Sequence, residues 1–100
     1  MDKRGALKIA KHFLRELPKK YSTKRACLFG SFAKGTAHKG SDIDIALILP
    51  RCGDLFDTRP ELMQISRKID LLIEPHPMAQ EDFDESNSLA EEIKKYGIPL

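Results

Sequence analysis

The stretch GSFAKGTAHKGSDIDIALIL, residues 30–49, contains the features that decide the fold. Its last part, residues 42–49, is rich in Ile and Leu and ends at Pro50, which predicts a strand. Just before the stretch, residues 24–29 form a second short apolar run that stops at Gly30, and we expect another strand there. The two strands therefore enclose a polar segment that begins with a glycine–serine pair and ends with an Asp-x-Asp pair.

Further elements are predicted on both sides of these strands. Apolar residues in 3–17 recur at helical spacing until Pro18. Residues 69–74, IDLLIE, predict a third strand that is closed by Pro75 and Pro77. The remaining predicted elements are a short helical turn from Ser31 to Gly35, a helix that ends near Lys68 and a helix at 88–96. The resulting order, α-β-α-β-α-β-α, predicts an α+β fold in which helices cover a small sheet of at least three strands.

The composition limits the class of protein. One hundred residues suffice for a single domain, 1–100, and 41% hydrophobic with 32% charged residues is typical of a globular chain. A net charge of +2 is too small to argue for broad binding of nucleic acid or membranes. Because no apolar run of roughly 18 residues and no signal peptide is present, we expect a cytoplasmic protein with Cys27 and Cys52 reduced.

Asp42 and Asp44 open the strand at 42–49. Side chains two residues apart in a strand lie on the same face, about 6.6 Å apart. Because two carboxylates on one face repel, we expect a cation between them, and hard ions such as Mg²⁺ prefer carboxylate oxygens. Asp70, in the apolar run 69–74, is a third candidate ligand if its strand pairs beside 42–49. Three carboxylates can hold two metal ions.

Gly30 and Ser31 follow the first predicted strand directly. Glycine permits a positive φ and a close approach of the backbone to a ligand. Serine is a good helix N-cap, so the free N–H groups of a helical turn would point outward and attract phosphate. A phosphate-binding turn and metal-binding carboxylates on adjacent strands are the two parts that an enzyme acting on a nucleoside triphosphate needs.

The sequence GSFAKGTAHKGSDIDIAL, residues 30–47, resembles the signature of the DNA polymerase beta-like nucleotidyltransferase superfamily. The short chain is similar to the minimal nucleotidyltransferases, which lack an added acceptor domain. The resemblance implies a small mixed sheet flanked by helices and transfer of AMP from ATP with two Mg²⁺ ions, pyrophosphate being the leaving group. The site residues that it implies are Gly30, Ser31 and Lys34 for the nucleotide, and Asp42, Asp44 and Asp70 for metal binding and catalysis.

The resemblance also implies a partner. Minimal nucleotidyltransferases often pair with a separate helical HEPN-type toxin, which they adenylylate as antitoxins. We therefore expect transfer to a hydroxyl group of such a partner, most simply a tyrosine, in a homo- or hetero-oligomer. Two alternatives stay open at this point. One is a catalytically weak subunit that binds nucleotide and a partner, and the other is an enzyme that modifies a hydroxyl group of a small molecule or an RNA.

Three further polar residues have simple interpretations. Glu74 lies about 13 Å along the predicted strand from Asp70 and is interpreted as a strand-end charge. His38 lies between the two halves of the motif and is interpreted as a loop histidine. Lys34 fits a phosphate contact and a solvent-exposed position on a helical turn equally well.

Overall fold

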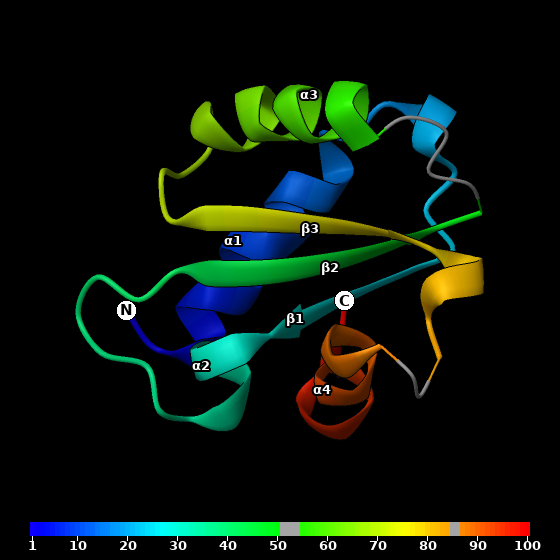
Figure 1. Cartoon of the computed structure of the whole chain (residues 1–100). Coiled ribbons are helices and arrows are strands. Elements are labelled where there is room, and N and C mark those ends of the chain that lie inside the picture. Colours follow the sequence, from blue (N-terminus) through cyan, green and yellow to red (C-terminus); the bar gives the residue numbers. More distant parts are fainter. Residues whose placement is uncertain (51–54, 85–86) are drawn as a thin grey trace.

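The computed structural model describes residues 1–50, 55–84 and 87–100, and contains a four-stranded sheet with helices on both faces (Figure 1). The strands are β1 (Arg25–Phe29), β2 (Ile43–Leu49), β3 (Ile73–Ala79) and β4 (Ile98–Pro99). The helices are α1 (Lys3–Arg15), α2 (Gly30–Lys34), α3 (Leu55–Arg67) and α4 (Ser88–Tyr96), with 3₁₀ turns η1 (Lys19–Tyr21) and η2 (Gln80–Asp82).

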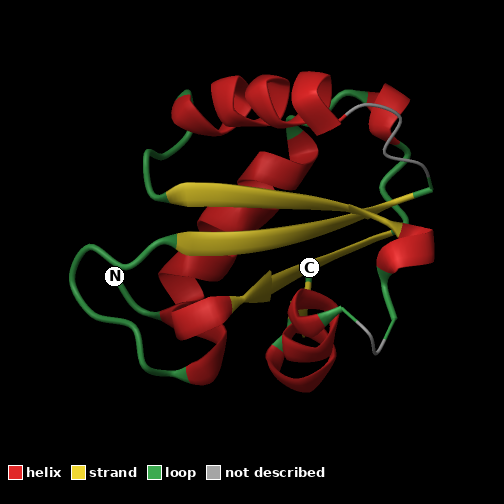
Figure 2. Cartoon of the chain, viewed as in Figure 1, coloured by secondary structure: helices red, strands yellow, loops and turns green. Residues whose placement is uncertain are grey.

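The sheet has the strand order β3-β2-β1-β4. β1 runs antiparallel to β2 and to β4, whereas β2 and β3 are parallel. Figure 2 shows the helices in separate layers around this sheet. The predicted mixed α+β fold is therefore confirmed, and β4 is an additional short strand that the sequence pattern did not indicate.

One face of the sheet is packed against α1 and α3, and α1 lies behind the strands in Figure 1. Ile43, Ile45 and Leu47 of β2 point to this side and join a core that includes Phe13 of α1 and Leu62 of α3. These five side chains are at most 1% exposed. The burial of continuous apolar rows on this face supplies most of the favourable free energy of folding.

The opposite face divides into an apolar part and a polar part. Ala46 and Ile48 of β2 pack with Ala90 and Ile93 of α4, which lies in front of the sheet in Figure 1. Asp44 points to this same face, because successive side chains of a strand alternate between faces. The polar part of the face therefore lies toward the beginning of β2, beside the region that α4 covers.

The strand predicted at 69–74 is wrong, because β3 begins at Ile73 and continues through Pro75 and Pro77. The N–H group of Ile43 donates to Leu72 O, so the even-numbered residues of β3 turn their backbone groups toward β2. The nitrogens of both prolines therefore face the outer edge of the sheet, where the absence of an N–H group breaks no ladder hydrogen bond.

Asp70 lies in the turn before β3 and not in the sheet. Its Oδ1 accepts a hydrogen bond from the N–H group of Leu72 at 2.8 Å, so the Asp70 side chain forms an Asx turn.

Over the described ranges of the chain, no helix is long and apolar enough to cross a membrane.

Candidate functional site

The two halves of the motif at residues 30–44 meet in space. The last residue of β1, Phe29, lies opposite Asp44 of β2, and Gly30 begins α2 immediately afterward. Gly30 has a φ of 73°, and a Cβ atom at this position would overlap the carboxylate of Asp44. A glycine is therefore needed here both for the backbone conformation and for the close approach of the Asp44 side chain.

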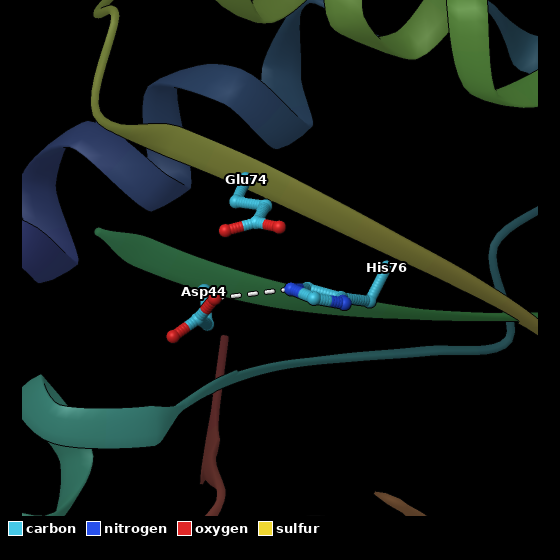
Figure 3. Close-up of side chains that lie close together, drawn as sticks. All are labelled: Asp44, Glu74 and His76. Atoms are coloured by element: carbon cyan, nitrogen blue, oxygen red, sulfur yellow. Dashed lines mark hydrogen bonds and ion pairs between the residues drawn. The ribbon is translucent and has the colours of Figure 1, made fainter.

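Three side chains of this polar face converge at the centre of the site, as Figure 3 shows. Asp44 lies opposite Glu74 in the parallel pairing of β2 and β3, and His76 follows on the same face of β3. His76 Nε2 lies 3.0 Å from Asp44 Oδ1. One ligand atom from each of the three side chains lies within 4.8 Å of the others.

A loop holds Asp42 close to this group. The Oγ atom of Ser41 accepts a hydrogen bond from the N–H group of His38 at 2.9 Å, and the Ser41 N–H group donates to His38 O at 3.0 Å. This reciprocal pair closes the loop directly before Asp42. His38 is thus a loop residue that shapes the approach to β2, in agreement with its interpretation from the sequence.

The carboxylates of the site repel one another. Partial desolvation raises the pKa of the Glu74 carboxyl above its usual value although the residue as a whole is exposed, and a hydrogen bond with Asp42 and the negative charge of Asp44 raise it further. The imidazole of His76 acts in the opposite direction. Because a positive charge would relieve this repulsion, an arrangement of three carboxylates is suited to bind a divalent cation.

The interpretation of Glu74 as a strand-end charge is wrong, because the strand begins later than expected and Glu74 lies directly beside Asp44. Asp70, expected on this strand, is outside the group that contains Asp44, Glu74 and His76. The signal for Glu74 and His76 was an alternation of polar residues with prolines, which is typical of an edge strand when it occurs within a sheet.

Lys34 is engaged with α4. Its Nζ lies 2.7 Å from Glu92 Oε1 and 5.1 Å from the centre of the Tyr96 ring. The hydrogen bond to Glu92 raises the pKa of Lys34 above its usual value. A contact between Lys34 and phosphate therefore requires the lysine to leave this pair, and the role of Lys34 in nucleotide binding stays a prediction.

The donor set fits a divalent ion, since it combines carboxylate oxygens with one imidazole nitrogen. Beside it lies a pocket of about 220 Å³, between the start of β3 and α3. The residues that line this pocket are Asp42, Arg59, Met63, Leu71, Ile73, Glu74 and Pro75. Leu71 is 81% exposed, so the pocket has a large apolar side chain at its mouth.

Comparisons with known proteins identify the family and the fold. The family model of the nucleotidyltransferase domain matches residues 9–98. No curated protein matches the chain. A crystal structure of a candidate nucleotidyltransferase from Sulfolobus solfataricus is 22% identical, with a TM-score of 0.67 over 97% of this chain and 80% of that one.

Two further similar structures come from toxin–antitoxin systems. The first was crystallised with AMP-PNP, is 24% identical and has a TM-score of 0.62 over 99% of this chain and 72% of that one. The second is a mutant of the toxin–antitoxin MntA-HpeT in which two aspartates, two positions apart, are changed to glutamate. It is 23% identical, with a TM-score of 0.61 over 99% of this chain and 72% of that one.

Proposed function

The chain belongs to the nucleotidyltransferase domain family, and from that premise we propose that it transfers AMP from ATP to a hydroxyl group of a partner protein. The observation that carries the proposal is the convergence of Asp44 and Glu74 beside Gly30, which places a carboxylate cluster against the glycine that begins α2. The toxin–antitoxin structure with AMP-PNP is a similar fold crystallised with an adenine nucleotide analogue, which favours ATP as the donor.

In this proposal Asp42, Asp44 and Glu74 hold the divalent ions, Mg²⁺ in the simplest case. Bound metal stabilises the negative charge that develops on the phosphoryl oxygens during an in-line displacement. The acceptor oxygen forms a bond to the α-phosphorus, the bond to the bridging oxygen of the β-phosphate breaks, and pyrophosphate leaves. The acceptor proton passes to a carboxylate of the cluster, and Asp42 and Glu74 are the two of its carboxylates that also line the adjacent pocket.

The same pocket supports a tyrosine as the acceptor. Met63, Leu71 and Pro75 provide an apolar wall for an aromatic ring, and Glu74 lies at the polar end, where a phenol hydroxyl would be oriented. A tyrosine hydroxyl has an ordinary pKa near 10, so it needs a base or a metal ion to react at neutral pH. An open pocket at the surface is accessible to a segment of another protein.

We further propose that the partner is a HEPN-type toxin and that the chain acts as its antitoxin. Similar structures from toxin–antitoxin systems support a toxin as the partner, and the HEPN type rests on the family resemblance of the sequence. In one of them two aspartates are altered with the spacing that Asp42 and Asp44 have here, which supports the importance of an Asp-x-Asp pair in this fold.

The test is to incubate the protein with Mg²⁺, labelled ATP and the product of the neighbouring gene, and to determine intact masses. We expect the partner to gain the mass of AMP at a tyrosine, and Asp44→Asn to abolish the gain. Label that appears on RNA or on a small molecule would contradict the protein acceptor but retain the transfer. Unmodified partner that still binds the chain would indicate a catalytically weak binding subunit.

A pair of variants separates the two candidates for the third carboxylate. Glu74→Gln is expected to lower turnover strongly while the fold is retained. Asp70→Asn removes the charge but keeps an Oδ1 atom that can accept the Leu72 N–H bond, so it is expected to change neither stability nor turnover strongly. If Asp70→Asn lowers turnover as much as Glu74→Gln and leaves stability unchanged, the catalytic role belongs to Asp70.

A further inference from the structure

We propose that His76 is a direct metal ligand: its Nε2 atom, with the carboxylates of Asp44 and Glu74, binds Mn²⁺ in preference to Mg²⁺. The inference rests on the proposed function, because it concerns the metal ions of the same site. The carboxylates alone would provide only oxygen ligands, and His76 adds a nitrogen ligand to them.

The distance between two of the ligands supports this assignment. His76 Nε2 and Asp44 Oδ1 lie 3.0 Å apart. Two ligands at right angles, each about 2.1 Å from one ion, are separated by about 3.0 Å. An ion that displaces the proton between these atoms therefore needs little movement of either side chain. Glu74 offers an oxygen within 4.8 Å of both atoms, so it can complete one face of the same coordination sphere.

The three side chains are held by rigid elements. Asp44 lies on β2, and Glu74 and His76 lie on the same face of β3, in a parallel pairing with fixed register. The His76 ring packs edge-on against Phe29, with 4.9 Å between ring centres. The side chains of His76 and Asp44 are each 21% exposed, so both are largely shielded while still accessible to an ion. The ligand positions are thus preorganised by the sheet.

The chemistry of the donor set decides the preferred ion. Mg²⁺ binds oxygen ligands and retains several water molecules, whereas an imidazole nitrogen favours first-row transition metals. Mn²⁺ accepts both carboxylate oxygens and imidazole nitrogen in octahedral geometry. A site with two carboxylates and one imidazole should therefore bind Mn²⁺ more tightly than Mg²⁺, while a site made of carboxylates alone would discriminate less.

The competing explanation is that His76 only positions Asp44 by donating a hydrogen bond to it. The variant His76→Gln separates the two roles, because glutamine can still donate a hydrogen bond to Asp44 but lacks the imidazole nitrogen. His12→Gln is the matched control. His12 lies on α1, which packs on the opposite face of the sheet, and pairs with Glu16 at the surface.

The experiment measures Mn²⁺ binding to the whole chain by EPR, without nucleotide, and repeats the titration with Mg²⁺ as competitor. We expect pulsed EPR to detect a directly coupled ¹⁴N nucleus in the wild type and in His12→Gln, and to lose it in His76→Gln. The loss of a metal contact should weaken Mn²⁺ binding by about tenfold or more, with a smaller change for Mg²⁺.

The outcomes separate this inference from the proposed function. Bound Mn²⁺ without nitrogen coupling, and an equal affinity of wild type and His76→Gln, would overturn the role of His76 and leave AMP transfer with Mg²⁺ in place. Nitrogen coupling that disappears only in His76→Gln supports the role even if AMP transfer to a partner is not observed. Coupling that persists in His76→Gln would contradict the assignment of the ligand.

Discussion

The two faces of the central strands have different roles, and β2 shows the contrast most clearly. Ile43 and Ile45 are fully buried on the face that α1 and α3 cover. Asp44 lies between them in sequence, but its side chain is 21% exposed on the other face, beside Glu74 and His76. Because strand side chains alternate, one short segment supplies the hydrophobic core and the site at the same time.

The contrast suggests that stability and activity are separable in the first residues of β2. Substitutions of Ile43 and Ile45 should change the free energy of unfolding, whereas substitutions of Asp44 should change turnover. Gly30 is an exception, because a substitution there should change both properties. Its φ is positive, so a side chain would strain the backbone, and an added Cβ atom would overlap the Asp44 carboxylate.

The largest effect is expected for Asp44→Asn. A metal ligand contributes several kcal/mol to the transition state, which corresponds to a loss of more than about a hundredfold in turnover. The metal-free protein should keep its melting temperature or gain slightly, because a charge is removed from a group of repelling carboxylates. Turnover and thermal unfolding in EDTA measure the two quantities, and full activity of the variant would refute the metal assignment.

On the opposite face, Ile45→Ala should give the reverse pattern. Truncation of this fully buried side chain leaves a cavity and is expected to lower the free energy of unfolding by about 2–5 kcal/mol. Turnover per folded molecule, measured well below the melting temperature, should be unchanged. A loss of turnover larger than the loss of folded protein would show that the two faces are not independent.

Gly30→Ala tests the close approach of the backbone to the Asp44 side chain, and Gly35→Ala is its matched control. Both glycines have a positive φ, of 73° and 79°, so both variants should lose about 1–3 kcal/mol of stability through backbone strain. Only at Gly30 would the new Cβ meet Asp44, while at Gly35 no atom lies within 4 Å. Turnover should therefore fall in Gly30→Ala alone, and equal turnover of both variants would contradict this contact.

A smaller effect is expected for the pair of Lys34 and Glu92, which lie 2.7 Å apart. If Lys34 leaves this pair to contact phosphate, Lys34→Gln should weaken ATP binding a few-fold, and Glu92→Gln should strengthen it by releasing the lysine. Calorimetric titration with ATP and Mg²⁺ measures both. Unchanged ATP affinity in both variants would make the pair purely structural and remove Lys34 from the nucleotide site.

The smallest effect concerns pH. The folded protein raises the pKa of Glu74, chiefly through partial desolvation of its carboxyl group and through the hydrogen bond with Asp42, so folding favours the protonated form of Glu74. Stability from this group is present below its unfolded pKa and is lost as the pH rises through the folded value. Glu74→Gln should therefore stabilise the metal-free protein at pH 8 but not at pH 4.

The gain of Glu74→Gln at pH 8 should be at most about 1 kcal/mol, because Glu74 is exposed and water screens its charge. Urea unfolding in EDTA at both pH values gives the difference. Asp70→Asn, which removes a carboxylate outside the cluster, is the control, and an equal pH dependence in both variants would exclude Glu74 as the source.

The sequence pattern predicted most of the fold but only part of the site. The Ile- and Leu-rich run at 42–49 and the stop at Gly30 were sufficient to place β1, β2 and the aspartates, because these features depend on local geometry. The register of β3 was not predicted. Its prolines indicate the end of a strand unless the strand lies at an edge, and edge position is a property of the tertiary arrangement.

The wrong start predicted for β3 changed which residues were expected in the site. Because β3 begins at Ile73 and not at residue 69, Glu74 lies beside Asp44 in place of Asp70, and His76 joins the cluster. The contact between Lys34 and Glu92 joins two helices that are far apart in sequence, so no local pattern indicated it. Long-range pairing therefore decided which of the acidic residues became neighbours.

The prolines of the sheet also limit how other chains can attach. Pro75 and Pro77 turn their nitrogens to the free side of β3, and Pro99 lies on the other outer strand, β4. A strand that approached the β3 edge would find no N–H donors at these two positions, so continuation of the sheet into a second molecule is disfavoured there. A second molecule that bound at the β3 edge would therefore have to be recognised through side chains and not through a continued sheet.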